Sequence, residues 1–182
     1  MVKRVICCVL LTAAVLMSSA CSFIIPEELR GPHLKERLFD DDTKIAENAV
    51  GRILDSIKER DREGLKSVFS KNALTEAEDM EGGIEYLFEF VQGNVTSYTL
   101  DRGPISDLST EYGDRQEELK SWFYVITDKE KYVFFILQYS EDTFDSDNVG
   151  VYSLRVVKAE DEDTQMTYWT DMKIPGIYQP ET

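Results

Sequence analysis

The chain has 182 residues, which suffices for one domain with a tail or for two very small domains. Hydrophobic residues make up 42% of it and charged residues 30%, a balance that excludes both a wholly disordered chain and a membrane protein with several spans. The net charge of -15 also argues against nucleic acid as a partner, because affinity for phosphate groups comes from Lys and Arg.

The first segment of the chain has the pattern of an export signal. Lys3 and Arg4 precede a run of 16 uncharged residues, 5–20. This run is shorter than the roughly 20 residues of a membrane-spanning helix and fits the apolar region of a signal peptide. It ends in Leu-Met-Ser-Ser-Ala directly before Cys21, which resembles the bacterial lipobox. The resemblance implies residues 1–20 as a signal peptide and a lipid such as palmitate on Cys21. An ordinary signal peptide cut nearby and an uncleaved anchor are the alternatives.

All three cysteines of the chain lie within its first 21 residues. After cleavage the mature chain would keep only Cys21, with its sulfur acylated, which leaves no disulfide framework, thiol nucleophile or thiolate metal site. It would also lose Lys3 and Arg4, so that 18 basic residues would remain beside 35 acidic ones, a net charge of -17. Anionic lipid headgroups repel such a charge. We therefore expect the lipid to hold the protein at the cell membrane, facing outside the cytoplasm.

The rest of the chain divides into a tether with the lipidated cysteine, residues 21–39, and a single domain, residues 40–182. Proline, glycine and scattered charges are typical of such a tether. The acidic residues 40–42 suit a helix start, because carboxylates accept the free backbone N–H groups there. The apolar residues that follow recur at the steps of a helix with one buried stripe. They are Ile45, Ala49, Val50, Ile53, Leu54 and Ile57.

Two shorter helices are predicted after this one. Apolar residues at helical spacing place one over residues 65–69 and the other over residues 84–91. Thr75 and Glu78 have the spacing of a capping box, and Gly82-Gly83 is predicted to be a break between elements.

After residue 93 the pattern changes from helical to alternating. Residues 101–116 contain Gly103, Pro104 and Gly113 and are predicted to form a loop, with a short strand inside it as the alternative. The strands are predicted over residues 95–100, 119–127, 132–140, 149–159 and 164–174. Helices followed by an antiparallel meander of at least four strands indicate an α+β fold, in which the N-terminal helices pack on the sheet.

The strand over residues 132–139 is apolar on both of its faces. One face carries Tyr132, Phe134 and Ile136, and the other carries Val133, Phe135, Leu137 and Tyr139. A strand covered on one side alternates with polar residues, so this strand is predicted to be covered twice. The helices would cover one face. A second subunit, in a homodimer, or the sheet curling over itself would cover the other.

Four segments carry a resemblance to a known family: Gly83–Phe90, Ser121–Val125, Asn148–Tyr152 and Asp171–Tyr178. With the order of helices and strands, they make residues 43–178 resemble a family of bacterial lipoproteins catalogued only as a domain of unknown function. The resemblance implies the nuclear-transport-factor-like (cystatin-like) fold, a cone in which a curved antiparallel sheet wraps a long helix and leaves a pocket at the wide end. It carries no established mechanism.

Histidine chemistry is excluded from the domain, because the single histidine, His33, lies in the predicted tether. Ketosteroid isomerases, on a similar fold, work with Asp and Tyr in an apolar pocket, and tryptophan supplies a stacking wall for a flat or sugar-like ligand. The candidate pocket residues are Tyr98, Trp122, Tyr124, Tyr152, Trp169 and Asp171. The alternative is structural: the strand aromatics pack in the core, and Asp171 is a surface or capping residue.

No metal site and no cofactor are expected. Residues 145–150 superficially resemble a calcium-binding loop, but Val149 and Val156 stand where that loop needs an oxygen ligand and a Glu. The acidic run over residues 160–163 is predicted to be a solvated turn. The sequence also lacks the glycine-rich loops of nucleotide sites and the Gly-x-Ser-x-Gly elbow.

These observations favour a lipid-anchored, extracytoplasmic protein that works without catalysis, as a module that binds an unidentified small ligand or a protein. The first alternative is an enzyme with Asp171 or a tyrosine as its acid–base group in the pocket of the cone. The second is a purely structural envelope protein without a pocket. The size and polarity of the space between residues 45–57 and the strands distinguish the three hypotheses.

Overall fold

The computed structural model describes residues 32–166 and 172–179, with side chains from residue 41 onward. The chain divides into two compact units, residues 1–37 and 38–182, and the description below is that of the second. The predicted signal peptide and Cys21 lie outside the described residues. Among the helices of the described part, none is long and apolar enough to cross a membrane.

The first described helix, α2 (Pro32–Glu59), begins earlier than predicted. Its predicted start at residues 40–42 was wrong, and residues 32–39, assigned to the tether, are helical. Proline is tolerated in the first turn of a helix, where its missing N–H group has no partner to lose. The predicted apolar stripe is confirmed from Ala49 to Ile57, whereas Ile45 is 39% exposed.

Three short helices follow: α3 (Arg62–Lys66), α4 (Lys71–Glu76) and α5 (Met80–Phe90). The predicted capping box was wrong, because the caps are the side chains of Asp61, Ser70 and Asp79, each accepting a hydrogen bond from a backbone N–H. The predicted break at Gly82-Gly83 was also wrong, since both glycines lie inside α5. A side chain at Gly83 would place its Cβ 2.9 Å from Cβ of Ile177, so the glycine lets α5 approach the end of the chain.

The sheet has five strands in the order β1-β2-β3-β4-β5. They are β1 (Val95–Glu111), β2 (Asp114–Thr127), β3 (Lys131–Asp142), β4 (Gly150–Lys158) and β5 (Gly176–Ile177). The first four form antiparallel neighbours and β5 runs parallel to β4. The predicted meander and the α+β class are therefore confirmed.

Two parts of the sheet differ from the prediction. Residues 101–116, predicted as a loop, are the larger part of β1, the tight turn after it and the first residues of β2. Residues 164–174 were predicted to be a strand, but α6 (Glu162–Gln165) begins this stretch after a 3-10 turn, η3 (Ala159–Asp161), and the last strand, β5, starts at Gly176. A second 3-10 turn, η2 (Ser146–Asn148), joins β3 to β4.

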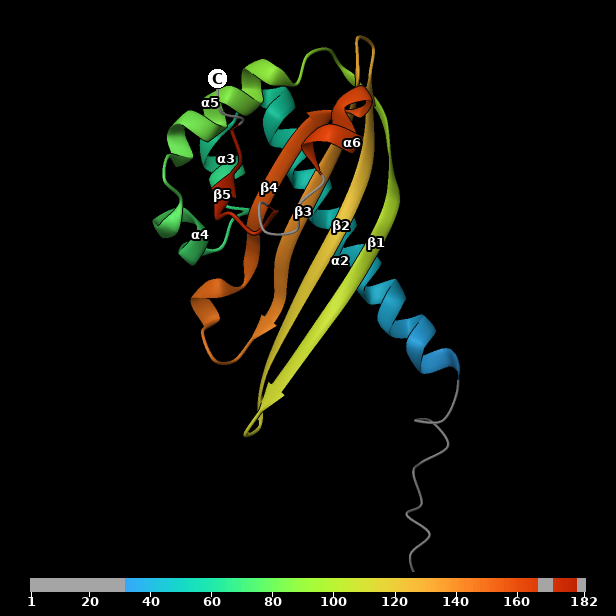
Figure 1. The fold of residues 1–182 in the computed structure, drawn as a ribbon, viewed down its shortest axis with the longest axis vertical. Helices are drawn as coiled ribbons and strands as arrows, with labels where there is room; N and C mark the ends of the chain where they lie inside the picture. Colours follow the sequence, from blue (N-terminus) through green and yellow to red (C-terminus); the bar gives the residue numbers. More distant parts are fainter. Residues whose placement is uncertain (1–31, 167–171, 180–182) are drawn as a thin grey trace, which may run out of the picture. The chain divides into compact units, whose positions relative to one another are not determined.

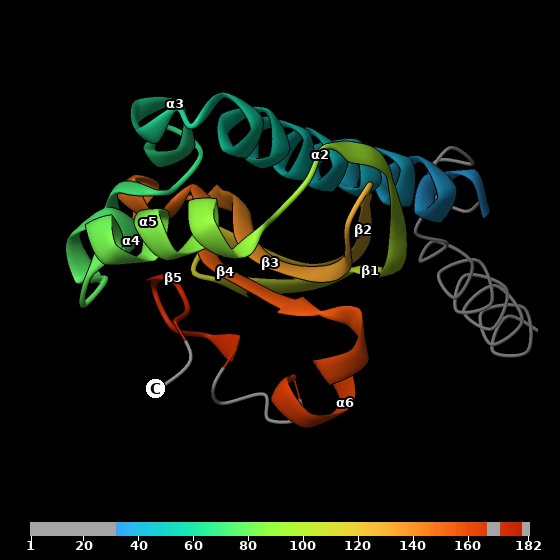
Figure 2. The same ribbon diagram turned by 90° about the horizontal axis from the view of Figure 1, so that it is seen from above.

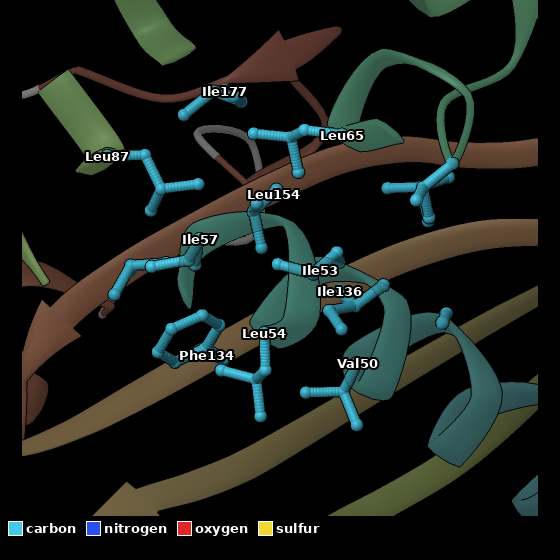
Figure 3. Close-up of a cluster of buried hydrophobic side chains, with 14 of the residues drawn as sticks. Val50, Ile53, Leu54, Ile57, Leu65, Leu87, Phe134, Ile136, Leu154 and Ile177 are labelled. Atoms are coloured by element: carbon cyan, nitrogen blue, oxygen red, sulfur yellow. The ribbon is translucent and has the colours of Figure 1, made fainter. Parts of the chain in front are cut away.

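Helices α2 and α3 lie on one face of the sheet, and α6 lies on the opposite face. Figure 1 shows the four long strands side by side with α2 behind them, and Figure 2 shows α2 and α3 above the sheet and α6 below it. Figure 3 shows how the α2 stripe meets β3 and β4 in a continuous apolar core. The labelled residues of this contact are Val50, Ile53, Leu54, Ile57, Phe134, Ile136 and Leu154. Apolar side chains therefore fill the space between the middle of α2 and the strands.

The second face of β3 is also buried, as predicted. Its apolar residues form a separate cluster with Trp122, Val157 and Met172, and Met166 packs against it. In the described chain this cover comes from Met166, directly after α6, and from Met172 at the start of the C-terminal segment (residues 172–179). The sequence pattern did not indicate this origin. The two apolar faces of β3 therefore do not by themselves require a second subunit.

Candidate functional site

A cavity of about 690 Å³ opens between the C-terminal half of α2, the end of α5 and the start of β1. We call it the rim cavity. Its apolar lining residues are Leu54 and Ile57 from α2, Phe88 and Val91 from the α5 side, and Val95 from β1. Cavities of roughly 300–1,000 Å³ with apolar lining residues are typical of small-molecule sites.

The sequence shapes this cavity by placing a glycine opposite a tyrosine. Gly51 lies on α2, and a Cβ atom built there would lie 3.7 Å from the hydroxyl oxygen of Tyr98. The missing side chain thus leaves room above the Tyr98 hydroxyl. The Tyr98 ring packs edge-on against Phe123, with centroids 6.4 Å apart, and the residue remains 41% exposed. The hydroxyl is therefore accessible from the cavity that Tyr98 lines.

Charges of both signs surround the opening. Asp55, Lys58, Glu89 and Lys129 all line it. Next to them, Asp128 accepts hydrogen bonds from the backbone N–H of Asn94, at 2.8 Å, and from its Nδ2, at 3.1 Å. These bonds lower the pKa of Asp128 from its ordinary value. The cavity therefore combines apolar lining residues with a polar, mixed-charge rim.

Trp122 and Tyr124 lie on the opposite face of the sheet, away from the rim cavity. The hydroxyl of Tyr124 donates to Oε2 of Glu162 at 3.1 Å, and Nη2 of Arg102 lies 2.5 Å from Oε1 of the same carboxylate. The Arg102 guanidinium also lies 5.2 Å from the centre of the Trp122 ring. The hydrogen bond to Glu162 raises the pKa of Tyr124. These contacts attach α6 to the sheet.

Tyr152 is the fourth described residue of the predicted pocket. Its hydroxyl donates to Oε2 of Glu76 at 2.8 Å, and its ring meets Tyr139 edge-on at 5.8 Å. Burial, and then the hydrogen bond to Glu76, raise the pKa of Tyr152 to about 12. At neutral pH this phenol is a hydrogen-bond donor and not a base.

The structure does not bring the predicted pocket residues together. Of the four that it describes, Tyr98 lines the rim cavity, while Trp122 and Tyr124 share the neighbours Arg102 and Glu162 on the other face. Trp169 and Asp171 lie outside the described residues.

An ionic cluster around the buried Glu118, on the second face of the sheet, was not predicted from the sequence. Glu118 is only 8% exposed. Its Oε1 lies 2.6 Å from Nζ of Lys120, its Oε2 lies 2.6 Å from Nζ of Lys173, and Tyr139 donates to Oε2 at 3.0 Å. Lys120 also pairs with Asp107. Opposite charges two residues apart on one strand face, as in Glu118 and Lys120, were the signal available in the sequence.

Each group in this cluster keeps its charge. Burial raises the pKa of Glu118, but the hydrogen bonds from Lys120 and Lys173 outweigh it, so the pKa is lower than usual. Burial likewise lowers the pKa of Lys173, but the hydrogen bonds to Glu118 and Tyr139 outweigh it, and the pKa is raised. Compensated charges of this kind hold two segments together and are not poised to transfer a proton at neutral pH.

Metal ligands do not converge in the described residues, where no group of three or more His, Cys, Asp or Glu side chains could hold an ion. In the stretch that superficially resembled a calcium loop, Asp145 accepts from Nδ2 of Asn72 at 2.8 Å and Asp147 pairs with Lys71 at 2.6 Å. Both carboxylates thus bind other parts of the chain.

Comparison with known proteins places the chain in a family without assigning it a role. No curated protein matches it at a significant level. The model of the family described as "Domain of unknown function (DUF5104)" matches residues 52–159, from the second half of α2 to the end of β4. This is more than half of the chain, and it contains most of the rim cavity. The chain therefore belongs to the DUF5104 family.

Proposed function

We propose that this chain is a bacterial lipoprotein, anchored by a lipid on Cys21 and facing outside the cytoplasm, that binds a small amphipathic molecule in the rim cavity. The observation that carries the proposal is the rim cavity itself, about 690 Å³ in volume. An apolar body of a ligand would lie on Leu54 and Val91, with its polar end at the mixed-charge opening.

Three features support assignment to the nuclear-transport-factor-like class. The helices precede a meander of long antiparallel strands. The long helix α2 packs along one face of that sheet. The rim cavity is lined by residues of α2, α5 and β1. A cone with a pocket at one end has this arrangement.

Binding without catalysis is favoured by the chemistry of the lining. Tyr98 offers a hydroxyl, and the charged groups stand at the opening, where water screens them. A general base needs a pKa near the working pH and a position within reach of the substrate. Tyr124 and Tyr152 each donate a hydrogen bond to a glutamate. Both have raised pKa values, and both lie outside this cavity.

Ligand binding in the rim cavity is tested by a substitution on α2 that fills the cavity. A leucine at Gly51 keeps the helix and projects into the space above the Tyr98 hydroxyl, whereas an alanine there makes ordinary contact at 3.7 Å. The probe is N-phenyl-1-naphthylamine, a neutral fluorophore, added to protein that starts at Ser22. We expect saturable binding, unchanged in Gly51→Ala and weakened about tenfold in Gly51→Leu. Equal binding in the two variants, or none in the wild type, would remove the proposal.

The lipid anchor is tested by replacing Cys21, with the replacement of Cys8 as the matched control. Cells expressing the full chain are fed a palmitate analogue that can be detected after reaction with a dye. We expect labelled protein from the wild type and from Cys8→Ala, and none from Cys21→Ala. Labelling that survives in Cys21→Ala would reject the lipid site.

A further inference from the structure

Strand β1 forms an open edge of the sheet, since no described strand pairs with its outer side (Figure 1). It has 17 residues, whereas most strands have about five or six. Its register with β2 shifts three times before Ile105, and Pro104, at the last shift, has no N–H group to donate. From Ile105 to Glu111 the register is unbroken. We call residues 105–111 the edge segment, because they form the regular part of this edge.

The edge segment lacks the features that protect most sheet edges. Bulges, prolines and lysines usually keep an exposed edge from pairing with another strand, and residues 105–111 contain none of these. Ile105 is 42% exposed on one face of the sheet, and Leu108 is 54% exposed on the other. The edge segment is therefore an exposed strand with apolar side chains, a surface that favours pairing with a strand of another molecule.

The hairpin turn determines which backbone groups of the edge segment point outward. Only Tyr112 and Gly113 separate the two strands, so Glu111 and Asp114 form the hydrogen-bonded pair that closes the hairpin. Backbone groups along a strand point to alternate sides in the plane of the sheet. Those that point away from β2 belong to Ser106, Leu108 and Thr110.

Neighbouring contacts agree with this alternation. Arg115 lies opposite Thr110, and its carbonyl oxygen accepts a hydrogen bond from the backbone N–H of Thr143, just after β3, at 2.8 Å. Arg115 therefore directs its backbone groups away from β1, and Thr110 directs its own away from β2. Within the described part of the chain, no hydrogen bond reaches the backbone groups of the three outward residues. The edge segment thus offers free donors and acceptors to a further strand.

We propose that two copies of this chain pair through their edge segments, which run antiparallel about a two-fold axis at Leu108. The two Leu108 residues then lie opposite each other and exchange backbone hydrogen bonds, as Ser106 of each copy does with Thr110 of the other. The two leucine side chains meet on one face of the joined sheet, which buries apolar surface that is exposed in a single copy. This interface goes beyond ligand binding in the rim cavity and does not depend on it.

The two carboxylates of the edge segment select this register. With the axis at Leu108, Asp107 lies opposite Ser109. Glu111 lies opposite Ile105, so no like charges face each other. With the axis at Asp107, this side chain would face its own copy, and with the axis at Ser109, Asp107 would face Glu111. Like charges directly opposite each other on neighbouring strands destabilise the pairing. Because one register makes the edge segment complementary to itself, we infer a second copy as its partner.

The interface is small, so the dimer should be weak and reversible. It joins only one short segment from each copy, and interfaces below about 1,200 Å² are typical of transient complexes. The negative net charges of the two copies also repel each other, although salt at about 0.15 M screens exposed charges beyond about 8 Å. We expect a dissociation constant of about 10–100 μM.

The oligomeric state of the full chain tests the interface. Sedimentation equilibrium is measured at protein concentrations from about 5 to about 500 μM, in a detergent whose density matches that of the buffer. The wild type should change from monomer to dimer over this range. Leu108→Lys should raise the dissociation constant at least about tenfold, because two lysines would meet at the axis. Ile105→Lys is the matched control: its lysine would face Glu111 of the second copy, so the dimer should form at least as well as in the wild type.

A mixture of two variants tests the position of the axis. Leu108→Glu alone should also be monomeric, whereas equal amounts of Leu108→Lys and Leu108→Glu should form a heterodimer, because residue 108 faces its own copy only when the axis passes through it. Leu108 is exposed, so neither variant should unfold, and circular dichroism checks this. A wild type that stays monomeric would leave the edge segment to a strand of a different protein and would overturn the proposal. Equal association of Leu108→Lys and Ile105→Lys, or a mixture that stays monomeric, would also overturn it.

Discussion

Nζ of Lys173 lies 2.6 Å from Oε2 of Glu118, although 55 residues separate them in the chain. The ion pair connects the C-terminal segment to the second face of β2. Met172, next to Lys173, packs in the apolar cluster on that face. A polar anchor and an apolar contact at adjacent positions thus hold the segment that covers β3.

Replacement of Glu118 with Gln should lower the free energy of unfolding by about 1–3 kcal/mol. The substitution leaves Lys120 and Lys173 close to an uncharged amide and removes their shared partner. Urea denaturation at pH 7 measures the change. Glu141→Gln is the matched control, because Glu141 is more exposed and lies 3.6 Å from Arg115. A loss within about 0.5 kcal/mol is expected there.

The effect of Glu118→Gln should depend on pH. Burial raises the pKa of Glu118, but the hydrogen bonds and charges of the two lysines lower it by more than burial raises it. The pKa of Glu118 in the folded protein therefore lies below its pKa in the unfolded chain. Such a group stabilises the protein above the unfolded pKa, and this contribution is lost as the pH falls through the folded pKa. The difference between wild type and variant should therefore be full above about pH 5 and shrink below about pH 4. A difference that stays constant from pH 7 to pH 3 would show that the carboxylate charge is not its source.

Two helix glycines should respond to alanine with opposite signs. At Gly51 the new Cβ meets the Tyr98 hydroxyl at 3.7 Å, which is ordinary contact, so Gly51→Ala should stabilise the protein by about 0.5–1 kcal/mol through the helix. At Gly83 the new Cβ would lie 2.9 Å from Cβ of Ile177, and Gly83→Ala should destabilise it by about 1–3 kcal/mol. Thermal unfolding followed by circular dichroism compares them. Equal shifts would mean that α5 and β5 do not pack this closely.

The helical stripe and the central strand could be predicted because burial leaves a pattern in their sequences, a helical period in α2 and a continuous apolar run in β3. Ala49 and Ile53 are buried at helical spacing, and Phe134 and Phe135 are buried on opposite faces of one strand. The pattern of β3 also predicted that something covers its second face. It could not identify the C-terminal segment as that cover, because Met172 follows no local period.

The far half of the β1–β2 hairpin could not be predicted, because burial leaves no pattern in its sequence. Residues 105–111 of β1 are exposed on both faces, so no apolar alternation marks them as a strand. Gly103-Pro104 favours a loop, yet it lies within β1, where the register with β2 is irregular. Strand pairing, not burial, maintains this part of the sheet.

The candidate site depends on contacts between distant parts of the chain. Gly51 and Tyr98 meet across the rim cavity. The residue types are visible in the sequence, but their proximity follows only from how α2 crosses the sheet. The residue type of Tyr98 marks it as a candidate in the sequence, whereas nothing in the sequence marks the glycine that faces it.

An asparagine in place of Tyr112 should stabilise the turn of the β1–β2 hairpin. Tyr112 and Gly113 have φ angles of 51° and 99°, and a two-residue turn with both angles positive favours Asn-Gly. The Tyr112 side chain is 99% exposed and loses no packing when it is replaced. Tyr112→Asn should therefore raise the free energy of unfolding by about 0.5 kcal/mol. Tyr112→Val should lower the free energy of unfolding, because a side chain branched at Cβ is disfavoured at positive φ. Urea denaturation measures both variants. If Tyr112→Val is more stable than Tyr112→Asn, the proposed turn conformation is wrong.

The apolar contact of the C-terminal segment can be tested at Met172. Met172 is 5% exposed and belongs to the same cluster as Phe135 and Leu137. An aspartate there would bury a charge against apolar side chains, so Met172→Asp should detach the segment and lower stability by about 2–4 kcal/mol. Met172→Leu keeps the volume and should cost less than about 1.5 kcal/mol.

Detachment should also change the oligomeric state. Without residues 172–179 the second face of β3 presents a contiguous apolar surface, and such surfaces promote association. Sedimentation velocity should show larger species for Met172→Asp than for Met172→Leu at equal concentration. If Met172→Asp is as stable and sediments at the same rate as Met172→Leu, the C-terminal segment does not cover this face. The homodimer expected from the two apolar faces of β3 would then be the better explanation of their pattern.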